Sequence, residues 1–201
     1  LEFSLEALKK YEFAQLPRRV AGVQVNIGTF FDVQGEKNEA EQHWQKALNI
    51  NSAIGNLEQE ASIRLNYGVF HHHNNSFEKA IENWQQARTI FSSIGIQNKM
   101  AIGIGNLGEV YLQVCDYQNA FENLIKSIEI FRTVNDKSEE LNYLFVFGKF
   151  WFSIGDAKEL YETLDKYELL SLTENETSQK KEINKIYLRL LYQILSDNVM
   201  L

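Results

Sequence analysis

Glycine returns at a fixed interval of 40 residues through most of the chain, and this interval constrains the fold more than any other feature. Only 11 of the 201 residues are glycine, yet one column contains Gly28, Gly68, Gly108 and Gly148. Two further columns keep the same register: a small one with Ala40, Ala80 and Ala120, and a large apolar one with Trp44, Trp84 and Leu124. A period of this length indicates a repeat architecture, in which one small unit recurs along the chain.

Each repeat unit is predicted to contain two helices, because its large apolar residues are spaced three and four apart and so share one helix face. A short break separates the two helices at Gly35, Asn75, Cys115 and Gly155, and a second break ends the unit at Gly55, Gly95 and Asn135. Glycine and asparagine tolerate the left-handed conformation that such turns need, so Cys115 is the exception. The glycine and alanine columns let the two helices of a hairpin approach closely, which explains glycine inside a helix.

The predicted fold class is all-α, an α-solenoid of stacked antiparallel helix hairpins in one array. Lone hairpins cannot bury their apolar faces, whereas stacked hairpins can. The predicted segments are the second helix of a truncated repeat at 1–20, complete repeats at 21–60, 61–100, 101–140 and 141–180, and the terminal helix of a partial repeat at 181–201. The first helix is expected over about Leu1 to Ala14 and the last over about Ser178 to Leu195. Because the first residue is Leu1 and not Met, we expect a piece of a longer protein.

Composition excludes several classes of protein. The net charge of −7 disfavours nucleic acid and anionic membrane as partners. No apolar run reaches the roughly 20 residues that a membrane span needs. The single cysteine, Cys115, excludes a disulfide within the chain and offers no thiolate cluster to a metal. A lone proline among 201 residues argues against a turn-rich β fold.

Motifs for catalysis or cofactor binding are also not expected. The glycines at 103, 105 and 108 have the spacing of a dinucleotide fingerprint, but they lie in a predicted helix without a preceding strand. Cys115 has no histidine placed by the sequence to activate it. The triplet His71-His72-His73 suggests a metal, yet adjacent helical residues point about 100° apart and cannot share one ion. We therefore expect no enzyme, no cofactor and no metal.

These columns resemble the tetratricopeptide repeat, whose motif reads W-x2-L-G-x2-Y, then A-x3-F, then A, then P. The third unit matches best, with Leu107, Gly108, Tyr111 and Ala120, and has Leu124 in the aromatic position. The period of 40 replaces the usual ~34, and no proline stops the second helix. The chain therefore looks like a long variant found in signalling scaffolds and in sensor regions of bacterial regulators. The resemblance implies a right-handed superhelix, a groove lined by the first helix of each hairpin, and binding of a peptide or protein.

An asparagine column marks the candidate groove at Asn26, Asn66 and Asn106. Asparagine is a poor residue for a helix interior, and its amide both donates and accepts, so a ladder of amides suits an extended peptide backbone. In related scaffolds an asparagine at this point contacts bound peptide. The alternative is that each amide bonds within its own array. Other candidate groove residues are His73, Glu109, Gln113, Phe145, Lys149 and Phe152.

The aromatic cluster of the fourth unit is larger than one helix face can bury. We expect the last helix, with Ile183, Ile186, Tyr187, Leu190 and Leu191, to cover Phe147 and Trp151, and Phe145 and Phe152 to contact a ligand. The predicted function is a non-catalytic, cytoplasmic scaffold module for a protein or peptide ligand. The alternative is a structural or oligomerising segment whose groove is filled by its own chain or by a second copy. The apolar C-terminal helix would then form a homodimer.

Overall fold

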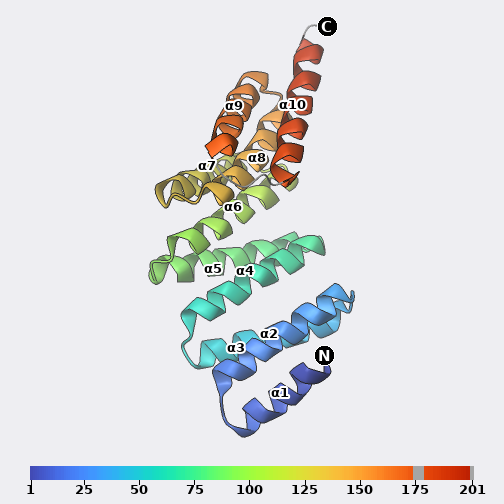
Figure 1. The fold of residues 1–201 in the computed structure, drawn as a ribbon, viewed down its shortest axis with the longest axis vertical. Helices are drawn as coiled ribbons and strands as arrows, with labels where there is room; N and C mark the ends of the chain where they lie inside the picture. Colours follow the sequence, from blue (N-terminus) through green and yellow to red (C-terminus); the bar gives the residue numbers. More distant parts are fainter. Residues whose placement is uncertain (174–178, 200–201) are drawn as a thin grey trace. The chain divides into compact units, whose positions relative to one another are not determined.

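The computed structural model of the protein describes residues 1–173 and 179–199, and within these ranges it contains ten α-helices joined by short turns (Figure 1). The helices are α1 (Glu2–Phe13), α2 (Pro17–Val33), α3 (Lys37–Ala53), α4 (Leu57–His73), α5 (Phe77–Ser93), α6 (Gln97–Gln113), α7 (Tyr117–Thr133), α8 (Lys137–Ile154), α9 (Ala157–Thr173) and α10 (Gln179–Val199). This all-α succession of antiparallel hairpins is the α-solenoid class that the repeat columns predict. Residues 174–178 and 200–201, parts of the predicted fourth repeat and terminal helix, lie outside the described residues.

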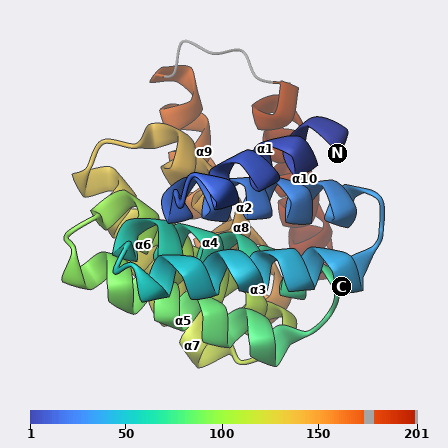
Figure 2. The same ribbon diagram turned by 90° about the horizontal axis from the view of Figure 1, so that it is seen from below.

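The chain forms two compact units, Leu1–Lys99 and Met100–Leu201, here called the N-terminal and the C-terminal unit. The N-terminal unit contains α1 and the hairpins α2–α3 and α4–α5, and α1 lies beside α2 in both ribbon views (Figures 1 and 2). The C-terminal unit contains nearly all of α6, the helices α7, α8 and α9, and α10. Each unit has its own apolar core, centred on Trp44 and Tyr67 in the first and on Leu124 and Phe150 in the second.

The first helix of each hairpin begins one turn before the repeat boundary that the sequence predicted. Helices α2, α4, α6 and α8 begin at Pro17, Leu57, Gln97 and Lys137, whereas the expected boundaries at 21, 61, 101 and 141 lie inside them. The apolar columns start only at the second turn of each helix, so periodicity alone places the boundary too late. Proline at the first helical position is the signal that marks the true start of α2, because its fixed φ and missing N–H suit that position.

The turns recur every 20 residues, twice as often as the side-chain columns. Each contains one residue with φ between +52° and +79°: Gln15, Gly35, Gly55, Asn75, Gly95, Cys115, Asn135 and Gly155. The chain then bonds back to the preceding helix, as where the N–H of Glu36 donates to the carbonyl of Phe31 at 2.9 Å. The expected left-handed turns at the glycines and asparagines are confirmed, and Cys115 adopts the same conformation despite its side chain.

The glycine column provides close contact between helices, as predicted, but its partner changes along the chain. A Cβ atom added at Gly28 would lie 2.5 Å from the Trp44 ring, and one at Gly68 would overlap the Trp84 ring. The two indole N–H groups donate to the carbonyls of Val25 and Leu65, at 3.2 and 3.1 Å. In the fourth unit Gly148 instead faces Leu188 of α10. Gly28 and Gly68 therefore allow close packing within a hairpin, whereas Gly148 allows close packing against α10.

The aromatic cluster of α8 is buried differently from the expectation. Phe147 and Trp151 pack on Phe121 of α7, with ring centroids 5.8 Å away in both cases. Phe145, expected to contact a ligand, instead meets Tyr187 of α10 at 5.6 Å. The reason is that α8 has neighbours on two sides, and the sequence pattern does not assign each ring to a side. The side chain of Ile183, expected in this contact, lies outside the described residues.

Candidate functional site: a cleft between α2 and α4

The N-terminal unit has a cleft of about 490 Å³ along the first helices of its two hairpins. We call it the α2–α4 cleft. Its lining residues are Tyr11 of α1, Arg18, Arg19, Gly22, Val23, Val25 and Asn26 of α2, and Gln59, Ser62, Ile63 and Asn66 of α4. The buried Ile63 and the partly buried Val25 provide apolar surface, and the remaining side chains are mostly polar. The site thus combines a small apolar surface with several hydrogen-bonding groups.

Two residues of the predicted asparagine column, Asn26 and Asn66, line this cleft. Both side chains are exposed, and neither amide has a hydrogen-bonding partner among the described residues. They occupy the same position in consecutive repeats, on α2 and α4. Each free amide offers one acceptor oxygen and two donor hydrogens, which is the complement of a peptide backbone.

Two arginines of the cleft were not predicted from the sequence. Arg18 and Arg19 belong to the first turn of α2, the turn that precedes the expected repeat boundary. Both are exposed, and neither forms an ion pair within the described part of the chain. Glu58, which precedes the lining residue Gln59, pairs instead with Lys99 at 2.9 Å. Reading Pro17 as the first helical residue would have placed both arginines on the same helix as Asn26.

The third member of the asparagine column is bound within its own unit. The hydroxyl of Tyr143, on α8, donates to the side-chain oxygen of Asn106 at 2.9 Å and lies 3.2 Å from the carbonyl oxygen of Ile102. The Tyr143 ring lies directly on Gly105, where no side chain blocks it. Burial raises the pKa of Tyr143, so this hydroxyl keeps its proton and remains a donor. The Tyr143 side chain therefore fills the space beside Asn106, whereas the corresponding space beside Asn26 is part of the cleft.

Three other predicted groove residues contact one another in the C-terminal unit. Lys149 of α8 lies 3.5 Å from the carboxylate of Glu109 on α6 and 5.5 Å from the centre of the Phe145 ring. Phe152 is partly buried against the core of that unit. Gln113 is exposed at the end of α6, and His73 is exposed at the end of α4. The predicted residues therefore divide into a free pair, Asn26 and Asn66, and a group that is mostly engaged by its own chain.

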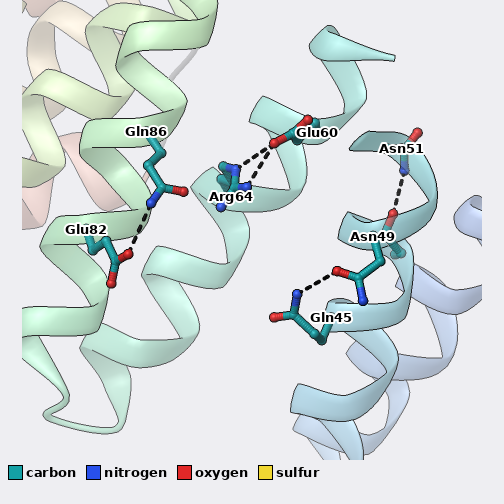
Figure 3. Close-up of polar contacts among 8 residues, drawn as sticks. Gln45, Asn49, Asn51, Glu60, Arg64, Glu82 and Gln86 are labelled. Carbon is teal, nitrogen blue, oxygen red and sulfur yellow. Dashed lines mark hydrogen bonds and ion pairs between the residues drawn. The ribbon is translucent and has the colours of Figure 1, made fainter. Parts of the chain in front are cut away.

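A second polar surface runs over α3, α4 and α5, and its side chains bond mainly within their own helices (Figure 3). Arg64 holds the nearly buried carboxylate of Glu60 at 2.8 Å. Gln45 donates to Asn49 at 2.9 Å, and Gln86 donates to Glu82 at 3.1 Å. Groups that satisfy one another in this way have less capacity for a ligand than the free amides of the α2–α4 cleft.

Neither a metal site nor a membrane span emerges from the described residues. No three His, Cys, Asp or Glu side chains there are grouped so that they could hold a metal ion. Among the same residues, every helix is too short or too polar to cross a bilayer. His71, the first residue of the histidine triplet, is buried against the ring of Tyr67 at 4.4 Å and serves the core.

Comparison with known proteins identifies the repeat. A family model described as tetratricopeptide repeat matches residues 59–133, from α4 to the end of α7. This stretch of the chain carries tetratricopeptide repeats. The matched stretch includes Asn66 and Asn106, together with two members of the glycine column. Among curated proteins, no sequence relative matches the chain.

Solved structures share the tetratricopeptide fold at low sequence identity. Aspartyl phosphate phosphatase F from Bacillus subtilis superposes with a TM-score of 0.84 and 14% identity, over 95% of this chain and 50% of that one. BtubC from P. vanneervenii gives 0.71 and 18%, over 81% of this chain and 68% of that one. A signal transduction ATPase with a tetratricopeptide repeat sensor, from Pyrococcus horikoshii, gives 0.68 and 19%, over 96% and 34%. The chain thus spans half of the first of these proteins and about a third of the last, and the likeness concerns the fold alone.

Proposed function

We propose that this tetratricopeptide array binds an extended segment of a partner protein in the α2–α4 cleft. The observation that carries the proposal is the pair Asn26 and Asn66, two free and exposed amides one repeat apart that line the same cleft. Tetratricopeptide repeats generally mediate contacts between proteins. The fold therefore supports the class of function, and the free amides support this cleft as the binding site.

The amides would hold the main chain of the ligand. A segment lying across α2 and α4 presents N–H and carbonyl groups along its length, and each amide can bond one of both kinds. The apolar surface at Val25 and Ile63 would take an apolar side chain of the segment. Because main-chain bonds are independent of sequence, the amides give affinity and the other lining residues give specificity.

The proposal is tested by selecting short random peptides on the chain and measuring their affinity for variants by fluorescence anisotropy. Gly22→Leu should abolish binding, because a Cβ at Gly22 meets nothing within 4 Å and the longer side chain would enter the cleft without disturbing the fold. Thr29→Leu is the matched control, since Thr29 is exposed on the same helix and does not line the cleft. Equal binding by both variants would contradict the site.

The asparagines are tested with the same peptides. Asn26→Ala combined with Asn66→Ala should weaken binding about fivefold for each amide, from the roughly 1 kcal/mol that a neutral hydrogen bond contributes. Asn106→Ala should leave the affinity unchanged, because that amide already accepts from Tyr143. If the double variant bound as tightly as the original chain, the amide pair would not hold the ligand.

The proposal also assigns no catalysis to these repeats and places them in a larger signalling or regulatory protein of the cytoplasm. The sequence, which contains no recognised cofactor or nucleophile motif, supports the first part. Similarity in fold to a signal transduction ATPase and an aspartyl phosphate phosphatase supports only the second. An assay of the chain for phosphatase activity on an acyl phosphate tests this part, and turnover above background would overturn it.

One observation favours a second function, self-association through α10. Ile186, Leu190 and Ile194 lie four residues apart on one face, and they are 54%, 57% and 49% exposed. Such a stripe is a candidate contact with a second copy of the chain. Light scattering over a range of concentrations should then show a mass that rises toward the dimer, and Leu190→Glu should prevent the rise. A constant monomer mass would exclude this function.

A further inference from the structure

The α2–α4 cleft carries positive charge in a chain that is negative as a whole. Its lining includes Arg18 and Arg19 and no acidic side chain. The chain has a net charge of −7. Glu58, which precedes the lining residue Gln59, pairs with Lys99, whose ammonium group also lies 3.3 Å from the hydroxyl of Ser62 at the cleft. The two guanidinium groups therefore remain without a negative partner in the described residues.

The rest of the chain sharpens this contrast. The N-terminal unit has ten basic and eleven acidic residues, so its net charge is −1. The C-terminal unit has the other ten basic and sixteen acidic residues, which gives −6. An acidic ligand is therefore repelled by the C-terminal unit and attracted by the cleft, and such a pattern favours one site over others.

We infer that the segment bound in the α2–α4 cleft is acidic, and that its Asp or Glu carboxylates pair with Arg18 and Arg19. This inference rests on the proposed function, because the same cleft and the same amides hold the segment. Arginine suits this role, since its planar guanidinium can meet both oxygens of a carboxylate at once.

Helix geometry places an arginine and the first amide on the same side of α2. Arg19 and Asn26 are seven residues apart, so they share one face, and their backbone positions lie about 10 Å apart along the axis. A segment that Asn26 holds therefore passes within reach of an arginine.

The experiment uses defined peptides and the whole chain. The probes are a labelled peptide of alternating Glu and Ser and its counterparts with Gln, Lys or phosphoserine in place of Glu, alongside the peptides selected from the random library. Arg18→Gln combined with Arg19→Gln is compared with Lys9→Gln combined with Lys37→Gln, which removes the same charge from exposed positions outside the cleft. Affinities are measured by anisotropy at low and at high salt.

The expected result is that the Glu peptide binds at least tenfold more tightly than the Gln and Lys peptides, and that the selected peptides are rich in Asp and Glu. The arginine variant should lose about tenfold for each guanidinium, and the lysine control should lose less than twofold. Salt should weaken binding to the original chain and have little effect on the arginine variant.

Other outcomes overturn the inference and are distinguishable from failure of the proposed function. Selected peptides that are neutral, or an arginine variant that behaves like the lysine control, would show that the cleft binds segments without preferring acidic ones. Much tighter arginine-dependent binding of the phosphoserine peptide would assign the arginines to phosphate and not to carboxylate. If the library yielded no peptide at all, the proposed function itself would fail, and the inference with it.

Discussion

The two units treat the same repeat position in opposite ways. On α2 the position is Asn26, beside Val25 and opposite Ile63, and its amide is free in a cleft. On α6 it is Asn106, beside Gly105 and opposite Tyr143, and the tyrosine both covers the glycine and bonds the amide. The same residue type thus recurs at this repeat position. Whether its amide is free or bonded depends on the residues of the next repeat that lie opposite it. In the C-terminal unit the Tyr143 side chain fills the space beside the amide, whereas in the N-terminal unit the amide lines a cleft.

The largest expected effect comes from replacing Gly105 and Tyr143 of the C-terminal unit by the residues at the matching positions of the N-terminal unit, Val25 and Ile63. Gly105→Val should destabilise the chain by about 3 kcal/mol, because the new side chain overlaps the buried ring of Tyr143. Adding Tyr143→Ile restores the pair found at Val25 and Ile63 and should recover much of the loss. Urea unfolding of both single variants and the double variant measures the coupling, expected at about 3 kcal/mol because it must exceed the cost of Tyr143→Ile alone. Strictly additive effects would contradict the view that Gly105 and Tyr143 pack as a pair, as Val25 and Ile63 do at the matching positions.

A smaller effect separates the two asparagines themselves. Asn106→Ala should lower the free energy of unfolding by about 1 kcal/mol, because the Tyr143 hydroxyl loses its closer acceptor and keeps only the carbonyl of Ile102. Asn26→Ala should change it by less than about 0.5 kcal/mol, as is usual for an exposed side chain without partners. The same urea experiment decides, and equal losses would mean that Asn26 has a structural role as well.

The units should also differ in their response to acid, since all four histidines lie in the N-terminal one. Burial lowers the pKa of His71 despite the carboxylate of Glu41, and Lys79 lowers it further. Burial and Lys46 also lower the pKa of His43, whose ring lies 2.6 Å from the amide oxygen of Gln24. Between these lowered values and about 6.5, the unfolded chain binds more protons than the folded one. The free energy of unfolding therefore rises with pH across this window and falls on acidification.

Urea midpoints at about pH 7.5 and about pH 5.5 lie on either side of the upper edge of this window. The midpoint should be lower at the acidic pH, and His71→Gln combined with His43→Gln should reduce the difference. His73→Gln is the control, because His73 is exposed and should leave the difference intact. An undiminished difference in the double variant would assign the acid sensitivity to other groups.

The smallest expected effect concerns the turns. Cys115 has φ +60°, whereas Gly35 and Gly155 occupy the matching turns of the first and fourth hairpins. Cys115→Gly should raise the free energy of unfolding by about 0.5–1 kcal/mol, because glycine adopts this conformation without steric strain. Gly35→Ala should lower it by a similar amount. Thermal unfolding followed by circular dichroism compares the two, and changes of the same sign would contradict this account of the turns.

The fold was largely predictable from the sequence, because its signals are local or strictly periodic. The columns at Gly28 and Trp44 predict two helices in close contact, and Gly35 and Gly55 predict the turns that separate them. The start of α2 needed a different signal, Pro17, and the apolar pattern alone missed the turn that carries Arg18 and Arg19. This first turn of α2, which the apolar pattern did not predict, bears more on the proposed site than on the fold.

The candidate site was predictable only in part. The spacing of Asn26, Asn66 and Asn106 marks the stripe, but whether an amide is free depends on a contact between residues 37 positions apart, Tyr143 and Asn106. The residues around Gly105 in the sequence do not indicate that the ring of Tyr143 packs against it. For the same reason the sequence did not show that Phe145 would meet Tyr187, or that Lys149 would pair with Glu109.

The central claim is that the N-terminal cleft is free for a ligand and its C-terminal counterpart is filled. Nuclear magnetic resonance of the asparagine side-chain amides, during titration with the tightest selected peptide, tests it most directly. The amide signals of Asn26 and Asn66 should shift with the peptide, and that of Asn106 should stay in place. A shift of Asn106 comparable to the other two, or no shift of Asn26 and Asn66 at saturation, would contradict the claim.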